Sequence, residues 1–382
     1  MDFDLSEEQR IFQKAIRAFA EKEIGPLVLQ AEEEERFPVE LFPRMGRLGY
    51  LGIRYPEVYG GSGADKITEC LWAEELFRIC RGIATSLFAH SHLGTFPIFA
   101  LGTEEQKSRF LGPAIKGEKI AAFALTEPNA GSDIQAIETT ARKEGNRYVL
   151  RGSKMFVTNG NLADYVLVAA YTDRPRRFEG ISLFIVERGT EGFRVSRKLR
   201  KEGSRSSETA ELNFEDCPIP AENLVGGREG VFRDILKTLV EGRVTIAAGA
   251  TGVARAAFEV ALQYAKERVA FGQPIGQFQA IGFKLADMAT CIEVSRTMIY
   301  RVAWMIDQRR NCTAEASMAK LFATEMAEKV TNEAMQVFGG YSQMREFPVG
   351  RFWRDARQLK IGEGTSEIQR RIICRQLGLK TD

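Results

Sequence analysis

The chain has 382 residues, of which 44% are hydrophobic and 27% charged, a composition typical of a soluble globular protein rather than a disordered one. Its formal net charge of +2, from 53 basic and 51 acidic side chains, provides no basic field, so neither nucleic acid nor membrane partners are expected. Six cysteines without a CxxC pair favour reduced thiols and a cytoplasmic location over a disulfide scaffold or zinc site. The acidic N-terminus lacks the apolar core of a signal peptide, and no uninterrupted apolar run is long enough to span a bilayer.

Residues 1–120 carry a helical period and predict an N-terminal all-α domain. Ser6 is a plausible helix cap before an amphipathic run that includes Ile11 and Phe12. Further helical patterns cover residues 67–80 and 84–100. The two histidines of the chain, His90 and His92, lack further ligands at a metal-site spacing, so we expect no metal site. The sequence favours core packing or pocket lining for both.

From residue 121 the period changes to two, which predicts a central β domain up to residue 230. The strands are short, turn signals separate them, and no helical pattern intervenes. This arrangement suggests an antiparallel barrel or sandwich. The expected strands cover residues 121–126, 137–143, 147–155, 165–171, 181–187, 193–197 and 209–216.

Residues 231–382 return to a helical period, and their long helices and short connections predict a C-terminal four-helix-bundle domain. Gly249 and Gly252, in an alanine-rich stretch, form a small-residue face that another helix can approach closely. The predicted fold class is therefore α+β multidomain, with domains at 1–120, 121–230 and 231–382 that pack as one body. The expected helices cover residues 231–268, 278–310, 313–338, 348–359 and 366–377.

A single carboxylate, Glu363, stands between two glycines where one predicted helix ends and the next begins. Glycine permits backbone conformations that a Cβ forbids, and Thr365 or Ser366 can cap the following helix. One interpretation is an ordinary glycine C-cap followed by an N-cap. The other is a carboxylate that must approach a ligand closely with few side chains around it. The stretch alone leaves both open.

Three further stretches combine turn residues with groups that can meet a polar or planar ligand. Residues 124–133 leave the first strand as a loop that can present backbone N–H groups and hydroxyls. Residues 154–160 end another strand with Phe156 and Thr158, two apart, which we expect to face the same side. Residues 268–275 pair Arg268 with Phe271 at a helix end. Each stretch also has a purely structural interpretation, as a hairpin, a hydrophobic plug or a C-cap.

In this order and spacing the stretches resemble the acyl-CoA dehydrogenase family, over essentially the whole chain. The resemblance includes PEVYGG at 56–61, LGTEEQK at 101–107, K-x-G-x-R-x-S-x-T at 201–209, QVFGG at 336–340 and RDA at 354–356. It implies the acyl-CoA dehydrogenase fold and an FAD-dependent oxidoreductase that converts an acyl-CoA to the 2-enoyl-CoA in fatty acid or carboxylic acid degradation. It also implies electron-transfer flavoprotein as the electron acceptor and a homo-oligomer, at least a dimer and usually a dimer of dimers.

The resemblance also implies roles for individual residues. Glu363 would be the base that takes the α-proton, while the hydride from Cβ passes to flavin N5. A ribityl hydroxyl and the Glu363 N–H would stabilise the developing enolate at the thioester oxygen. The implied substrate contacts are Ser132, Arg243 and Gly364. The implied FAD contacts are Phe123, Leu125, Thr126, Gly131, Ser132, Phe156, Thr158, Arg268, Phe271, Phe278, Gln279, Gln336, Gly339, Gly340, Thr365 and Glu367.

Some members of the family carry the base on the helix around residue 241 instead. The matching position here is Gly242, and Glu241 lies about 100° away around a helix, so its side chain should point elsewhere. Glu363 is therefore the preferred base. Val240 replaces an aspartate that lies near the CoA pantetheine in several members, so that contact is not expected.

Two departures from the family pattern bear on the acyl group. Gly362 stands where many straight-chain enzymes have a bulky residue, which leaves room for a branched, cyclic or aromatic group. Ala84 stands where glutaryl-specific members carry an arginine for the distal carboxylate. We therefore expect a short, branched or cyclic acyl group rather than a long straight chain or a dicarboxylic one.

Three alternatives use the same scaffold. An enoyl-CoA reductase would run the reaction in reverse, because direction follows the potential of the partner. A nitroalkane-oxidase-like flavoprotein would favour aspartate at the base position. A non-catalytic flavin-bearing binding scaffold is expected to have lost the base, and Glu363 is present.

Overall fold

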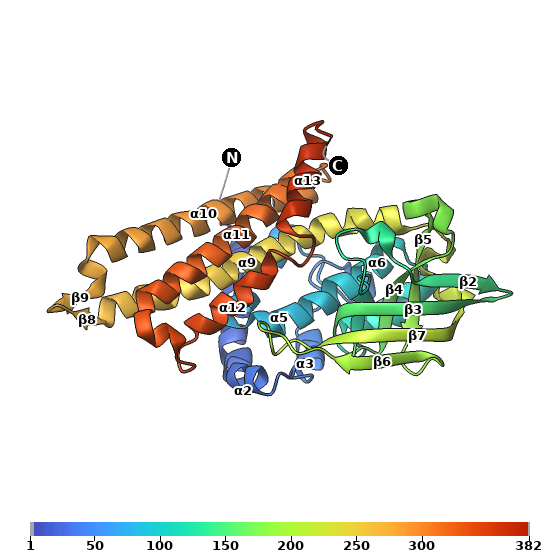
Figure 1. Ribbon diagram of the computed structural model, residues 1–382, viewed down its shortest axis with the longest axis horizontal. Helices are drawn as coiled ribbons and strands as arrows, with labels where there is room; N and C mark the ends of the chain where they lie inside the picture. Colours follow the sequence, from blue (N-terminus) through green and yellow to red (C-terminus); the bar gives the residue numbers. More distant parts are fainter. Residues whose placement is uncertain (1–3, 381–382) are drawn as a thin grey trace.

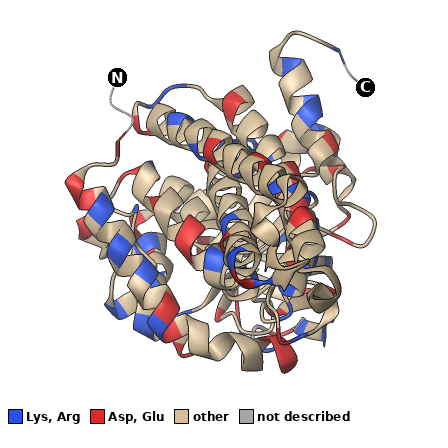
Figure 2. Cartoon of the chain, turned by 90° about the vertical axis from the view of Figure 1, so that its left-hand side faces the viewer, with Lys and Arg blue, Asp and Glu red and all other residues tan. Residues whose placement is uncertain are grey.

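The computed structural model describes residues 4–380. Long helices run along one side of the molecule, a curled sheet lies at the opposite end, and N-terminal helices fill the space beside and between them (Figure 1). Basic and acidic residues are interspersed along the ribbon at the helical end of the molecule (Figure 2).

The N-terminal region is helical, as expected. The Ser6 hydroxyl accepts a hydrogen bond from the Gln9 N–H and forms a capping box with it, which confirms the predicted start of the first helix. The predicted helix at 84–100 is divided by a π-helical turn, Ala89–Gly94, that contains both histidines. The helices are α1 (Glu7–Phe19), α2 (Val28–Glu33), α3 (Leu41–Arg47), α4 (Lys66–Ile79), α5 (Arg81–Phe88), α6 (Phe96–Leu101), α7 (Glu104–Gln106) and α8 (Gly112–Ile115).

The central region forms one curled sheet in the order β1-β4-β2-β3-β7-β6, with β5 also paired to β4. The prediction of purely antiparallel pairing is wrong for β4, which pairs in parallel with β1 and β2. Strand β4 is buried on both faces, and its alternate residues enter two separate hydrophobic cores. The strands are β1 (Ala121–Ala124), β2 (Thr140–Glu144), β3 (Arg147–Thr158), β4 (Tyr165–Tyr171), β5 (Ile181–Glu187), β6 (Phe193–Lys198) and β7 (Thr209–Pro220).

The C-terminal region contains the long helices, and each predicted helix is present. Among residues 4–380, α9 alone has the length and composition of a membrane span, but 78% of its most apolar window is buried inside the protein, as in the core helix of a bundle. The elements are α9 (Phe232–Glu267), the hairpin of β8 (Val269–Ala270) and β9 (Gln273–Pro274), α10 (Gln279–Asp307), α11 (Thr313–Phe338), α12 (Val349–Leu359) and α13 (Ser366–Gln376).

The small-residue face of α9 receives α4, as predicted. A Cβ at Gly252 would lie 2.1 Å from the carbonyl oxygen of Glu74, and one at Gly249 would lie 2.7 Å from the Phe77 ring. One hydrophobic core therefore joins the N-terminal helices to the C-terminal bundle. The domain boundaries at 120/121 and 230/231 stay a prediction, because the N-terminal and C-terminal helices share this core.

Candidate active site

Glu363 lies in the turn between α12 and α13, and its backbone is held in a left-handed conformation. Its φ is +57° and that of Gly364 is +89°, so the non-glycine residue adopts the strained geometry. Lys320 fixes the turn by donating from Nζ to the Gly364 carbonyl oxygen at 2.8 Å. The Thr365 hydroxyl accepts from the Ile368 N–H at 3.2 Å and caps α13, as predicted. A strained backbone at a carboxylate residue, in a turn held by two hydrogen bonds, is typical of a functional position.

The Glu363 carboxylate faces α9 and the π-helical turn. A Cβ placed on Gly242 would lie 3.4 Å from Glu363 Oε2 and 3.2 Å from His92 Nε2, so the glycine leaves space between these two groups. Desolvation raises the pKa of Glu363, although neighbouring positive charges, among them Arg243 and Lys320, oppose the shift. A raised pKa brings a carboxylate closer to the range in which it can accept and release a proton near neutral pH.

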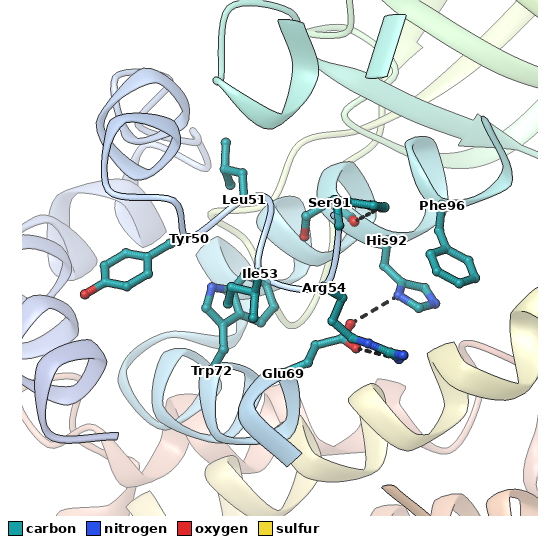
Figure 3. A pocket seen from close by; sticks show the side chains of 10 residues that line it. Tyr50, Leu51, Ile53, Arg54, Glu69, Trp72, Ser91, His92 and Phe96 are labelled. Atoms are coloured by element: carbon teal, nitrogen blue, oxygen red, sulfur yellow. Dashed lines mark hydrogen bonds and ion pairs between the residues drawn. The ribbon is translucent and has the colours of Figure 1, made fainter. Parts of the chain in front are cut away.

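Glu241 points into a different cluster, as its helical position predicts. Its carboxylate forms an ion pair with Arg54 and lies 3.9 Å from Lys66 Nζ. The same cluster borders a pocket lined by Tyr50, Leu51, Ile53, Arg54, Tyr55, Glu69, Trp72, Ser91, His92 and Phe96 (Figure 3). His92 lines this pocket, one of the two roles that the sequence favours, but its proximity to Glu363 has no signal in the sequence.

The residues expected at the flavin ring come from the ends of β1 and β3, which are hydrogen-bonded to each other. The Met155 N–H donates to the Thr126 carbonyl oxygen at 2.8 Å. Phe156 has φ +60° and is 66% exposed. A register shift between Lys154 and Val157 interrupts the alternation on which we expected Phe156 and Thr158 to share a face. Phe123, Leu125 and Thr126 are partly buried beside them, and Gly131 and Ser132 lie on an exposed loop.

These residues fit a planar aromatic cofactor. The exposed Phe156 ring offers a stacking surface, and a Cβ at Gly131 would meet no atom within 4 Å. Thr365, at the N-terminal cap of α13, and the exposed Glu367 in its first turn add polar groups. Such a surface can hold a flavin ring and its ribityl chain.

A second set of expected FAD contacts lies at the far end of the helical bundle, next to the β8–β9 hairpin (Figure 1). The guanidinium of Arg268 lies 5.6 Å from the Tyr341 ring, and the rings of Phe271 and Phe278 are 6.1 Å apart. Phe271 is 96% exposed. Gln279, Gln336, Gly339 and Gly340 are also exposed at the neighbouring helix ends. Within one chain, this set is not brought together with Glu363.

The residues expected to contact the substrate differ in exposure. Ser132 is exposed, whereas Arg243 is partly buried and its Nε has no hydrogen-bond partner within residues 4–380. A Cβ at Gly362 would lie 3.0 Å from Gln358 Nε2, so Gln358 occupies the side on which we inferred free space. Arg81 in turn hydrogen-bonds the Gln358 side chain.

Comparison with known proteins gives one consistent result. Models of the acyl-CoA dehydrogenase N-terminal, middle and C-terminal domains match residues 6–118, 122–217 and 231–378. The chain is 43% identical over 373 residues to a short-chain specific acyl-CoA dehydrogenase of Clostridium acetobutylicum, covering 98% of each chain. It superposes on butyryl-CoA dehydrogenase from Megasphaera elsdenii with a TM-score of 0.96 at 42% identity, covering 99% of this chain and 100% of that one.

A further match is a chain solved in a study of the electron transferring flavoprotein of Acidaminococcus fermentans. Its TM-score is 0.96 at 42% identity, and 99% of each chain is covered. Full-length matches of this quality, together with the three domain models, establish the family and the fold. The chain belongs to the acyl-CoA dehydrogenase family of FAD-dependent oxidoreductases.

Proposed function

We propose that this enzyme dehydrogenates a short-chain acyl-CoA at Cα–Cβ with Glu363 as the base. The observation that carries the proposal is the geometry of Glu363: a desolvated carboxylate at φ +57°, next to the space left by Gly242. The similarity to short-chain and butyryl-CoA enzymes supports the substrate class. The ion pair between Glu241 and Arg54 supports Glu363 rather than Glu241 as the base.

Glu363 would take the α-proton, and its own backbone would stabilise the charge that develops on the thioester oxygen. Within residues 4–380 the Glu363 N–H donates no hydrogen bond, whereas the neighbouring Gly362 N–H is bound to the Gln358 carbonyl oxygen at 3.1 Å. A free N–H beside the base can bind the carbonyl oxygen of the substrate, as in an oxyanion hole. Lys320, bound to the Gly364 carbonyl, keeps this turn in place.

FAD would supply the hydride acceptor for Cβ. Phe123, Leu125, Thr126, Phe156 and Thr158 would hold its ring, with Thr365 and Glu367 at the start of α13. The second set of contacts, around Arg268 and Phe271, lies too far away within one chain, so we propose that a second copy supplies it and that the enzyme is a homo-oligomer. The 96% exposure of Phe271 fits a side chain that a bound molecule or subunit covers.

The acyl pocket is proposed to favour short or branched groups over dicarboxylic ones. Ala84 is buried and offers no cation for a distal carboxylate. Gln358 bounds the space beside Gly362, so a branched or cyclic group would have to displace its side chain. Electron-transfer flavoprotein is the proposed electron acceptor, in keeping with one structural neighbour, and a cytoplasmic location stays a prediction.

Anaerobic bleaching of the bound flavin tests the proposal. Holoenzyme would be mixed with butyryl-, isobutyryl-, octanoyl- and glutaryl-CoA, with the Glu363→Gln variant alongside. We expect butyryl- or isobutyryl-CoA to bleach the flavin of the wild-type enzyme fastest, and no thioester to bleach that of the variant. Fastest bleaching by octanoyl- or glutaryl-CoA would contradict the substrate class. If no saturated thioester bleaches the flavin, and enoyl-CoA instead restores the yellow colour of a pre-reduced enzyme, the reductase alternative is favoured.

A further inference from the structure

His92 is a buried imidazole that three neighbours fix in place. Its ring lies between those of Phe88, 5.3 Å away at 12°, and Phe96, 5.2 Å away at 5°. Its Nδ1 is 3.2 Å from Glu69 Oε1, and the residue is 5% exposed. The stack and the hydrogen bond together set both the plane and the rotation of the ring. Figure 3 shows Phe96 and the hydrogen bond to Glu69.

Glu69 is held as a carboxylate, which fixes the tautomer of His92. Lys66 Nζ donates to Glu69 Oε2 at 2.6 Å, and Arg54 Nη1 lies 3.5 Å from the same oxygen. Burial alone would raise the pKa of Glu69, but Lys66, His92 and Arg54 hold it well below its usual range. An ionised carboxylate only accepts hydrogen bonds, so Nδ1 carries a proton, and in the neutral imidazole Nε2 then presents a free lone pair.

That Nε2 has no hydrogen-bond partner within residues 4–380, although it is buried. Buried polar atoms are nearly always bonded, so an unpaired one indicates a missing partner. The space in front of it is the one left by Gly242, which Glu363 Oε2 borders from the other side. Any side chain at position 242 would separate the two groups. The orphaned acceptor and the proposed base therefore border the same space.

We propose that His92 is a positioning residue for the base: its Nε2 accepts the proton that Glu363 has taken from the substrate. In this step the O–H bond of the Glu363 carboxyl group breaks, an N–H bond forms at Nε2, and the Glu363 carboxylate is regenerated. The imidazolium so formed donates from Nδ1 to the Glu69 carboxylate, which neutralises its charge. No electrons move. The inference rests on the proposed role of Glu363 as base.

The charges around the pair favour this direction of transfer. Glu69 stabilises the imidazolium directly, while Lys66 and Arg54 keep Glu69 ionised. On the other side, Arg243 and Lys320 stabilise the regenerated Glu363 carboxylate. Two further carboxylates lie at this cluster: Glu241 forms an ion pair with Arg54, and Asp307 accepts from the Lys66 N–H at 3.0 Å. The proton can then leave through the pocket that His92 and Arg54 line.

Exchange of the substrate α-hydrogen with solvent measures this step separately from oxidation. The probe is 3-thiabutyryl-CoA, in which sulfur replaces the β-carbon, so that the α-proton can be removed but no hydride can follow. Without a relay, the proton stays on Glu363 and returns to the same carbon. With the relay, it leaves and deuterium from D₂O replaces it.

Deuterium incorporation at Cα would be followed by mass spectrometry in the holoenzyme and in His92→Phe, which keeps the aromatic stack but lacks the nitrogens. We expect exchange to fall at least tenfold, while single-turnover flavin reduction by butyryl-CoA falls only about threefold. His92→Gln, which can still bond Glu69 but cannot take a proton, should behave in the same way and covers the case in which the first variant does not fold. Equal losses in both rates, or unchanged exchange, would overturn the relay. Persistent exchange in Glu363→Gln would instead overturn the proposed base.

Discussion

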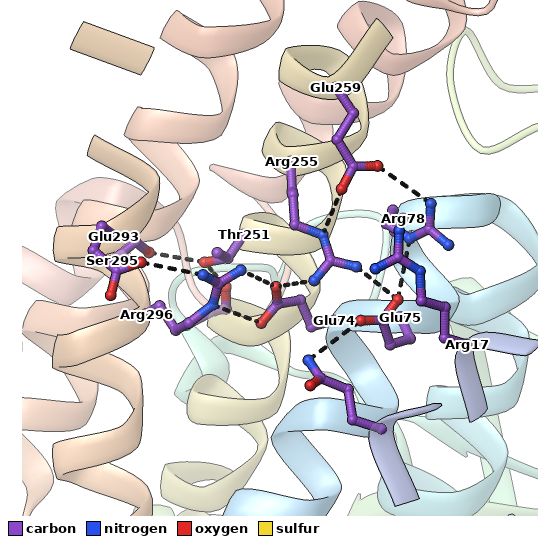
Figure 4. A network of polar contacts seen from close by, with 12 residues as sticks. Arg17, Glu74, Glu75, Arg78, Thr251, Arg255, Glu259, Glu293, Ser295 and Arg296 are labelled. Carbon is purple, nitrogen blue, oxygen red and sulfur yellow. Dashed lines mark hydrogen bonds and ion pairs between the residues drawn. The ribbon is translucent and has the colours of Figure 1, made fainter. Parts of the chain in front are cut away.

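The buried ion pairs between α4, α9 and α10 make a strong prediction about stability. Glu74, with a side chain 2% exposed, accepts from Arg255 Nη1 at 2.7 Å and from Arg296 Nη2 at 2.6 Å (Figure 4). Replacing Glu74 by glutamine removes the negative charge between two guanidinium groups in the interior. Breaking one side of such a buried pair costs about 3–5 kcal/mol, because the remaining charge is left uncompensated. Glu75 and Glu259 still bind Arg255, so we expect about 3 kcal/mol.

Glu293→Gln is the matched control, since Glu293 pairs with the same Arg296 at 3.2 Å but has a side chain 69% exposed. An exposed pair contributes at most about 0.5–1 kcal/mol. Both variants would be compared with the wild type by thermal denaturation at one protein concentration, FAD concentration and scan rate, because unfolding of a large flavoprotein is often irreversible. We expect the apparent Tm to fall by roughly 5 °C or more for Glu74→Gln and by about 1 °C for the control. Equal shifts would show that the buried ion pair of Glu74 contributes no more to stability than the exposed one of Glu293.

Three further changes test other parts of the structure. Gly252→Ala places a Cβ against the Glu74 carbonyl and should lower the free energy of unfolding by about 3 kcal/mol. Gly112→Ala, whose Cβ would have its nearest contact at 4.0 Å, is the control and should leave stability unchanged. Similar melting curves for the two variants would contradict this prediction. Burial lowers the pKa of His90 to about 4, so between pH 6.5 and 4 the unfolded chain binds a proton at His90 and the folded chain does not. About 3 kcal/mol of stability is therefore lost as the pH falls from 6.5 to 4. His90→Gln should flatten this loss in pH-dependent melting, and an unchanged slope would argue against it. Lys320→Met removes a cation that opposes the raised pKa of Glu363, so the acid limb of the flavin-reduction rate should move to higher pH; an unmoved limb would show that Lys320 acts only through the backbone of Gly364.

Much of the fold follows from patterns that are local in the sequence. The bounds of β4, β5 and α11 agree with the predicted ranges because each is a continuous apolar or periodic run with clear ends. The parallel pairing of β1 with β4 could not be predicted, since a strand's neighbours depend on how the sheet curls. The π-helical turn at Ala89–Gly94 was missed for a similar reason: its residues follow a helical pattern, and only the backbone shows the wider turn.

The candidate site was predictable where its residues stand together in a motif. The glycines around Glu363 indicated an unusual turn, although Glu363 itself, and not only Gly364, has a positive φ. The role of His92 could not be predicted in this way, because its contacts with Phe88, Phe96 and Glu69 form only in the folded protein. The inference from Gly362 failed to anticipate Gln358, whose side chain reaches the glycine from the preceding helix.

The assignment of Glu363 as the base is tested most directly by the rate of flavin reduction by butyryl-CoA in Glu363→Gln, measured by anaerobic stopped-flow with Glu241→Gln as the control. General-base catalysis contributes about 10²–10⁴-fold, so we predict a loss of that size in Glu363→Gln while FAD remains bound. The rate of flavin reduction in Glu241→Gln should stay within about tenfold of the wild-type rate, because the Glu241 carboxylate forms an ion pair with Arg54. A Glu363→Gln enzyme that reduces its flavin at the wild-type rate, or a Glu241→Gln enzyme that fails to, would contradict the assignment of the base.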